Sequence, residues 1–125
     1  EDTKPERVVK AIIEELGWVA IKRKYPIGEL VLSPDFTIIP PCQDDSSNWK
    51  EVYKEVALVE VDGPYHDTPT QEIKTKRRDG LLTQAGYRVI HVDAELTKNK
   101  AYQTYLKDRL SEAILSQEKV VRIDG

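Results

Sequence analysis

Apolar residues recur at helical spacing near the start of the chain and predict an amphipathic first helix. The stretch Thr3–Glu6 has the features of a helix start: Thr3 can cap the helix, Pro5 suits its first turn, and Glu6 completes a capping box. The apolar positions that follow on one helical face are Val8, Val9, Ile12, Ile13 and Leu16. Gly17 is expected to end this helix.

Short apolar stretches in the middle of the chain predict β-strands. The stretch from Glu51 to Asp62 has a continuous apolar centre, which is typical of a strand buried on both faces. Further strands are predicted over residues 18–25, 29–32 and 36–39. A turn is expected at 26–28, and the polar stretch 42–50 is expected to be a loop.

The second half of the chain predicts a helix between two buried strands. The helix begins at the capping sequence that follows Thr68 and runs to Ala85, with Gly86 as its stop. A strand over 87–92 and a final helix over 101–117 follow. Because a helix that joins two apolar strands forms a crossover unit, we expect strands 55–61 and 87–92 to be parallel neighbours. With the two short stretches 29–32 and 36–39 taken together, the predicted order is α-β-β-β-α-β-α, which gives an α/β fold with a mixed central sheet flanked by helices.

Length and composition indicate one domain spanning residues 1–125. No apolar run approaches the ~20 residues needed to span a bilayer, and the single Cys42 excludes an internal disulfide, so we expect a cytoplasmic protein. The chain contains no Met, even at position 1, which predicts a processed chain or a part of a longer protein. The net charge of −3 argues mildly against a nucleic-acid partner, although such binding depends on where Lys and Arg are placed.

The densest group of chemically active residues surrounds the end of the strand that finishes at Asp62. Side chains alternate along a strand, so Glu60 and Asp62 point to the same face. Neighbouring carboxylates repel each other unless they are solvated, protonated or bound to a cation, and Mg²⁺ prefers such oxygen ligands. His66 follows a Gly-Pro turn and is a candidate base for a metal-bound water. An ordinary surface strand end with a turn histidine explains the same residues about as well.

Three more residues each have a structural and a functional interpretation. Asp35 lies between two apolar stretches, where Pro-Asp is also a common turn sequence. Glu6 completes the capping box, and it can face a site at the same time. His91 lies inside an apolar strand, which favours a core role over catalysis.

Two basic clusters are candidate contacts for the phosphates of a nucleic acid. A solvated surface is the alternative explanation for both of them. The candidate residues are Lys74, Lys76, Arg77 and Arg78 on the predicted second helix, and Lys22 and Lys24 on the first predicted strand.

Taken together, these motifs resemble the PD-(D/E)XK superfamily of nucleases, and most closely the endonucleases of very-short-patch-repair type and the small DUF559 domains. The residues that carry the resemblance span about positions 3–93. They are Pro5-Glu6, Tyr25-Pro26-Ile27-Gly28, Pro34-Asp35-Phe36, the stretch from Val59 to His66, and the stretch from Arg77 to Ile90.

The resemblance implies a restriction-endonuclease-like core and an endonuclease that uses Mg²⁺ or Mn²⁺ to hydrolyse phosphodiester bonds in DNA, with RNA the less favoured substrate. It also implies a role for each matching residue. Asp35 would be the central metal ligand, Glu60 or Asp62 would be the second acid, and a backbone carbonyl near Val61 would be a further ligand. His66 would activate water or stabilise the phosphate. Glu6 would be an acid near the metal, and Asp79 would be an acid farther out.

The chain departs from the family pattern at one position. The Lys that gives the family its name stands two residues after the second acid, and here Asp62 occupies that place. Two other functions therefore remain open. The stretch from Val59 to His66, with the basic helix after it, also resembles the RAP domain, a non-catalytic RNA-binding module of the same fold. A third hypothesis is a domain of a larger protein that has lost its activity.

Overall fold

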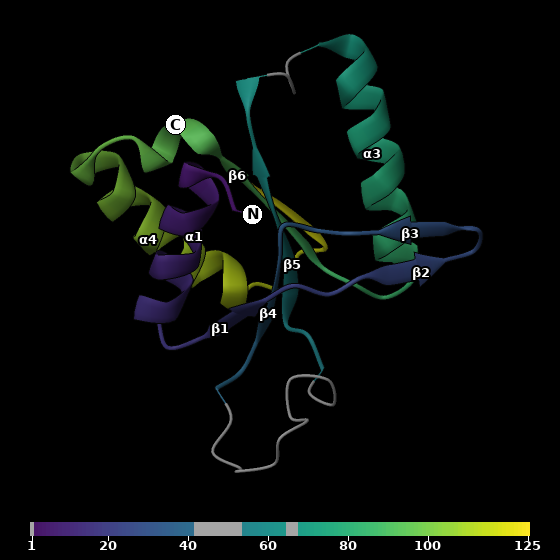
Figure 1. Ribbon diagram of the computed structural model, residues 1–125, viewed down its shortest axis with the longest axis horizontal. Coiled ribbons are helices and arrows are strands. Elements are labelled where there is room, and N and C mark those ends of the chain that lie inside the picture. The colour runs from purple at the N-terminus through teal and green to yellow at the C-terminus, as the bar shows by residue number, and fades with distance from the viewer. Residues whose placement is uncertain (1, 42–53, 65–67) are drawn as a thin grey trace.

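The computed structural model describes residues 2–41, 54–64 and 68–125, and this part of the chain is a mixed α/β structure (Figure 1). The expected loop 42–50, Cys42 and His66 lie outside the described residues. The described elements are α1 (Lys4–Glu15), β1 (Val19–Ile21), β2 (Tyr25–Ile27), β3 (Leu30–Leu32), β4 (Phe36–Ile39), β5 (Ala57–Asp62), α3 (Pro69–Gln84), β6 (Val89–Asp93), the 3₁₀ helix η2 (Ala94–Thr97), α4 (Lys100–Leu115) and β7 (Val120–Ile123).

The described strands form a five-stranded sheet in the order β1-β4-β5-β6-β7 and a separate two-stranded sheet, β2-β3. β1, β4 and β5 pair antiparallel, whereas β5, β6 and β7 run parallel. The expected parallel pairing is confirmed, with Leu58 opposite Val89 and Asp62 opposite Asp93. The sheet is therefore mixed, as the sequence predicts.

Helices cover both faces of the sheet: α1 and α4 lie on one side and α3 on the other (Figure 1). Strand alternation divides the core in the same way. Val59 and Ile90 belong to the larger apolar cluster under α1 and α4, whereas Leu58 and Val89 pack with Leu82 of α3. The centre of β5 is buried on both faces, as its apolar sequence predicts. Among the described residues, no helix combines the length and apolar character that a membrane span requires.

Local signals set the helix ends. The Thr3 hydroxyl accepts a hydrogen bond from the Glu6 amide, and the Glu6 carboxylate accepts one from the Thr3 amide at 2.8 Å, so the predicted capping box is present. Thr68 caps α3 by accepting from the Gln71 amide. Gly17 and Gly86 follow α1 and α3 with φ of 92° and 98°, a conformation that side chains with a Cβ rarely adopt.

The structure corrects the sequence prediction in three places. Residues 18–25 are not one strand, because β1 ends at Ile21 in the main sheet and β2 leaves to form a hairpin with β3. The turn of this hairpin is at residues 28–29 rather than 26–28, since Gly28 has the positive φ of 62° that the tight turn needs. β7 and η2 were not predicted, and β7 adds a parallel strand beside β6.

Candidate active site

Asp35 lies beside β5 although it is far from it in sequence. It directly precedes β4, whose Phe36 pairs with Val59, so Asp35 reaches the level of Glu60 and Val61. Its Oδ2 atom accepts a hydrogen bond of 2.7 Å from the Val61 amide. The carboxylate therefore takes the place of a backbone partner at the point where the β4–β5 ladder ends. Burial raises the pKa of Asp35 to about 6, with a further contribution from Glu6.

Glu6 meets Asp35 from the start of α1. The two carboxyl groups are hydrogen-bonded to each other, while Glu6 also accepts from the Thr3 amide. Burial opposes ionisation of Glu6, but the hydrogen bonds from Thr3 and Asp35 outweigh it and hold its pKa below the usual range. Two carboxyl groups form such a bond only when they share a proton, and burial favours the protonated form of Asp35. Both interpretations of Glu6 are thus compatible, since one side chain caps the helix and contacts Asp35.

Glu60 is the most strongly perturbed acid of this region. Its side chain is 15% exposed, and its Oε1 atom accepts a hydrogen bond of 2.9 Å from Nη2 of Arg78 on α3. Burial raises the pKa of Glu60 to about 8, although the Arg78 charge opposes the shift, and the nearby charge of Asp35 adds to it. Arg78 therefore contacts a candidate metal ligand in this structure.

Asp62 points to the same face as Glu60, as predicted, but its described contact is with His91 on β6. The Asp62 Oδ2 atom lies 2.9 Å from His91 Nδ1, and Asp79 Oδ2 of α3 lies 2.8 Å from His91 Nε2. Burial disfavours the charged imidazole, but its hydrogen bonds to both aspartates outweigh burial and raise the pKa of His91 to about 9. The expectation that His91 is a satisfied buried residue fits this geometry, and its partners are two aspartates.

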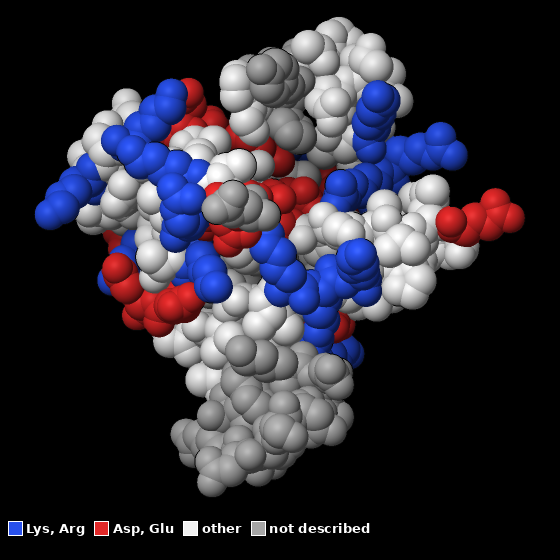
Figure 2. Space-filling view, in the orientation of Figure 1, with Lys and Arg blue, Asp and Glu red and all other residues white. Residues whose placement is uncertain are grey.

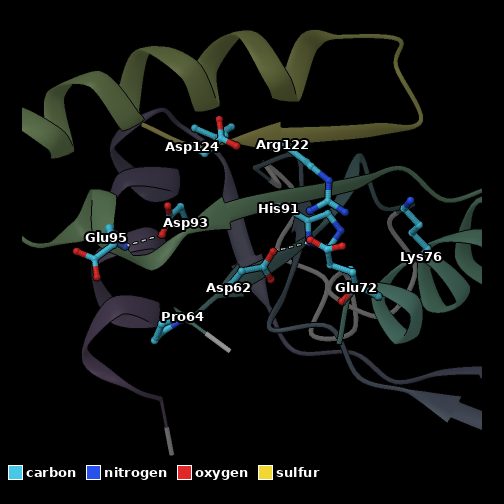
Figure 3. Close-up of a pocket in the computed structure, with 12 residues that line it drawn as sticks. Asp62, Pro64, Glu72, Lys76, His91, Asp93, Glu95, Arg122 and Asp124 are labelled. Carbon is cyan, nitrogen blue, oxygen red and sulfur yellow. Dashed lines mark hydrogen bonds and ion pairs between the residues drawn. The ribbon is translucent and has the colours of Figure 1, made fainter. Parts of the chain in front are cut away.

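Polar residues form two rows across the parallel strands on the α3 side of the sheet. In one row Glu60, His91 and Arg122 are register neighbours. In the next row Asp62 pairs with Asp93, and the chain continues from β7 to Asp124. A pocket of about 520 Å³ opens beside these rows and is lined by Asp62, His91, Asp93, Arg122 and Asp124, with Lys76 of α3 on its far side (Figure 3). Asp35, Glu60 and Glu6 do not line it, so the acid group and the pocket are adjacent but separate features.

Of the predicted basic residues, Arg78 contacts the acid group directly, through Glu60. Lys74, Lys76, Arg77 and Lys24 are exposed. Lys22 is also exposed but binds Asp2, with 2.8 Å between Nζ and Oδ1. Figure 2 shows acidic side chains gathered near the middle of this face, with Lys and Arg side chains on both sides of them.

Sequence reasoning missed the contacts of His91, Asp79 and Arg122. Asp79 is buried, and its Oδ1 atom has no hydrogen-bond partner among the described residues. Arg122 approaches the other oxygen of Asp79 at 3.9 Å. The sequence held one signal for the position of His91. Alternate residues of a strand point to the same face, so His91 faces α3 as Val89 does, and the predicted parallel pairing brings it beside Glu60.

The carboxyl groups near β5 suit a Mg²⁺ ion that keeps most of its water. Among the described residues, no three His, Cys, Asp or Glu side chains form a ready-made metal cage. Mg²⁺ commonly binds through one or two carboxylates together with substrate phosphates, and Asp35 and Glu60 supply two hard oxygen ligands. Burial raises the pKa of both acids, and a bound cation would oppose that shift by favouring their ionised forms.

Comparisons of the chain with models of protein families, with curated proteins and with solved structures found no match.

Proposed function

We propose that this protein is a metal-dependent nuclease that hydrolyses phosphodiester bonds in DNA, with the restriction-endonuclease-like core that the sequence motifs imply. The observation that carries the proposal is the hydrogen bond between Asp35 and the Val61 amide. It holds a carboxylate from the start of β4 beside Glu60 of β5, although 25 positions separate the two residues in the sequence. Two acids on neighbouring strands of the sheet meet the least demanding requirement of a Mg²⁺ site.

In this proposal each residue of the site has a separate role. Asp35 and Glu60 hold the cation, and Glu6 orients Asp35 through their shared hydrogen bond. A bound Mg²⁺ or Mn²⁺ ion would polarise the phosphate and lower the pKa of a coordinated water. His66, the proposed base, and the carbonyl of Val61, a proposed ligand, stay predictions from sequence. Asp62 is better assigned as a partner of His91 than as a primary ligand.

DNA is the proposed partner because exposed cations surround the acid group. The overall charge of −3 is unfavourable for binding a polyanion, but phosphate binding depends on local cations that release condensed counterions. Lys74, Arg77 and Lys24 are exposed and are the proposed contacts for phosphates on either side of the cleaved bond.

A non-catalytic nucleic-acid-binding module is the second candidate. The observation that favours it is the internal pairing of the acids: Glu60 binds Arg78, and Asp62 binds the His91 that also contacts Asp79. Such pairs also arise in domains where acids serve structure alone. Both candidates predict binding to nucleic acid, but only the first predicts cleavage.

The decisive experiment is Mg²⁺- or Mn²⁺-dependent nicking of supercoiled plasmid by wild type and by Asp35→Asn. We expect the substitution to lower the nicking rate by about 100-fold or more, the loss typical of removing one preorganised electrostatic group. Asp108→Asn on α4 is the matched control, because it removes an exposed acid distant in sequence from the site. Nicking that survives EDTA, or equal rates for Asp35→Asn and wild type, would contradict the proposal. DNA binding without any nicking by wild type would favour the second candidate.

A further inference from the structure

Arg78 occupies an unusual position for a helix-surface arginine. Its Nη2 atom donates to Glu60 Oε1 at 2.9 Å, while 34% of its side chain is exposed to solvent. Its Nε atom is buried and has no hydrogen-bond partner among the described residues. A guanidinium carries five N–H donors in a rigid fork, so binding Glu60 through one of them orients the others.

Two cationic side chains approach Glu60, and only one of them is accessible to a substrate. His91 is 4% exposed, and both of its ring nitrogens are engaged by Asp62 and Asp79. Arg78 is partly exposed to solvent, and the hydrogen bond that its guanidinium makes among the described residues is the one from Nη2 to Glu60. The next residue in the chain, Asp79, is anchored to His91, which fixes the turn of α3 that carries Arg78 against β6.

We propose that Arg78, oriented by Glu60 and open to solvent, contacts a non-bridging oxygen of the phosphate that is cleaved. This role rests on the proposed nuclease function and deepens it. Glu60 then has two tasks: it orients Arg78 through Oε1 and contributes its carboxylate to the cation site shared with Asp35.

The step balances without a further reactant. The water oxygen forms a new bond to phosphorus, and the bridging P–O bond breaks with its electron pair on the leaving oxygen. One water proton leaves to a base, and the leaving oxygen takes a proton from solvent. Arg78 keeps its protons throughout, because its pKa is too high for proton transfer, and it offsets the charge that grows on the phosphate oxygens.

The test compares Arg78→Gln and Arg78→Lys with wild type in plasmid nicking, together with calorimetric titration of Mn²⁺ alone. We expect Arg78→Gln to lower turnover at saturating DNA by about 100-fold or more, because a transition-state contact is lost. Mn²⁺ binding should be retained, since Asp35 and Glu60 remain. Arg78→Lys should recover part of the turnover by restoring the charge. Arg109→Gln on α4 is the control for loss of one exposed positive charge.

The outcomes separate this role from the function on which it rests. Wild-type protein that never nicks DNA refutes the nuclease and, with it, the role of Arg78. Wild-type nicking that Arg78→Gln retains at full rate overturns only the role of Arg78. Parallel loss of Mn²⁺ binding and turnover also overturns it, because Arg78 would then merely hold the site together. If circular dichroism shows that Arg78→Gln is unfolded, folded Arg78→Lys decides: reduced turnover with intact Mn²⁺ binding supports the proposal, and unchanged turnover overturns it.

Discussion

At the scale of single residues, Glu6 combines a structural and a proposed functional contact. Its carboxylate accepts from the Thr3 amide as part of the capping box, and it is hydrogen-bonded to Asp35. The capping contact needs only a side-chain oxygen, whereas the contact near the proposed cation needs a carboxylate. The two contributions can therefore be separated by substitution.

We predict opposite effects for Glu6→Gln and Thr3→Ala. The glutamine retains an oxygen that can accept from the Thr3 amide, so the free energy of unfolding should change little while the nicking rate falls. Thr3→Ala removes the cap and should lower the free energy of unfolding by about 1 kcal/mol while nicking continues. Urea denaturation and plasmid nicking measure the two effects. Equal losses of stability and activity in both variants would refute the separation.

At the scale of elements, Arg88 joins the end of α4 to the centre of the sheet. Its guanidinium donates to the carbonyl oxygens of Ala113 at 2.7 Å and Ile114 at 3.3 Å, and to Glu118 at 2.9 Å. The last carbonyls of a helix lack partners within the helix, and a cation there also suits the helix dipole. Burial lowers the pKa of Arg88, which shows that this charge sits in a partly desolvated place. Arg88, the residue before β6, is thus linked to the end of α4 and to the segment that precedes β7.

We predict that Arg88→Ala lowers the free energy of unfolding by about 2 to 3 kcal/mol, because several carbonyls lose a charged donor. Arg88→Lys should recover part of the loss, since a lysine restores the charge but not the fork. Chemical denaturation measures both variants, and Arg109→Ala on α4 controls for removal of an exposed arginine. A loss no larger than that of the control would mean that the carbonyls are equally well satisfied by water.

At the scale of the whole molecule, the distribution of charge matters more than its total. Acids gather near the middle of one face, and basic side chains lie around them (Figure 2). Burial raises the pKa of Asp35 to about 6 and of Glu60 to about 8, so the fold favours their protonated forms. His91 differs: burial opposes its charge, but its hydrogen bonds to Asp62 and Asp79 raise its pKa to about 9, so the fold favours its protonated form too. All three groups therefore stabilise the fold at low pH and lose that contribution as pH rises.

We predict that, without divalent cations, the melting temperature falls as pH rises from about 6.5 to about 9. A group with a raised folded-state pKa contributes fully below its unfolded value, and that contribution is lost as pH passes through the folded value. For Glu60 this window runs from 4.5 to about 8, and for His91 from 6.5 to about 9. Glu60→Gln should make the fall shallower, because the glutamine does not ionise. Thermal denaturation across this pH range measures both proteins, and a rising melting temperature would contradict the assignment.

The sequence by itself determined the elements that depend on local physics. The capping box at Thr3–Glu6, the amphipathic α1, the buried centre of β5 and the crossover through α3 all follow from residue spacing, because helix and strand periods impose them. The shared face of Glu60 and Asp62 follows from strand alternation in the same way. The capping box made Glu6 a candidate residue, whereas Asp35 was a candidate because it lies between two apolar stretches and matches the family motif.

Only the tertiary structure decided which charged groups meet. Arg78 and Glu60 are 18 positions apart, and Asp62 and His91 are 29 apart, so no local period relates either pair. The division of residues 18–25 between two sheets and the addition of β7 depend on which strands find partners. Such pairings arise when segments distant in sequence pack together. Residue spacing alone does not distinguish between the possible partners, and the burial of apolar surface and the pairing of buried charges decide which contacts form.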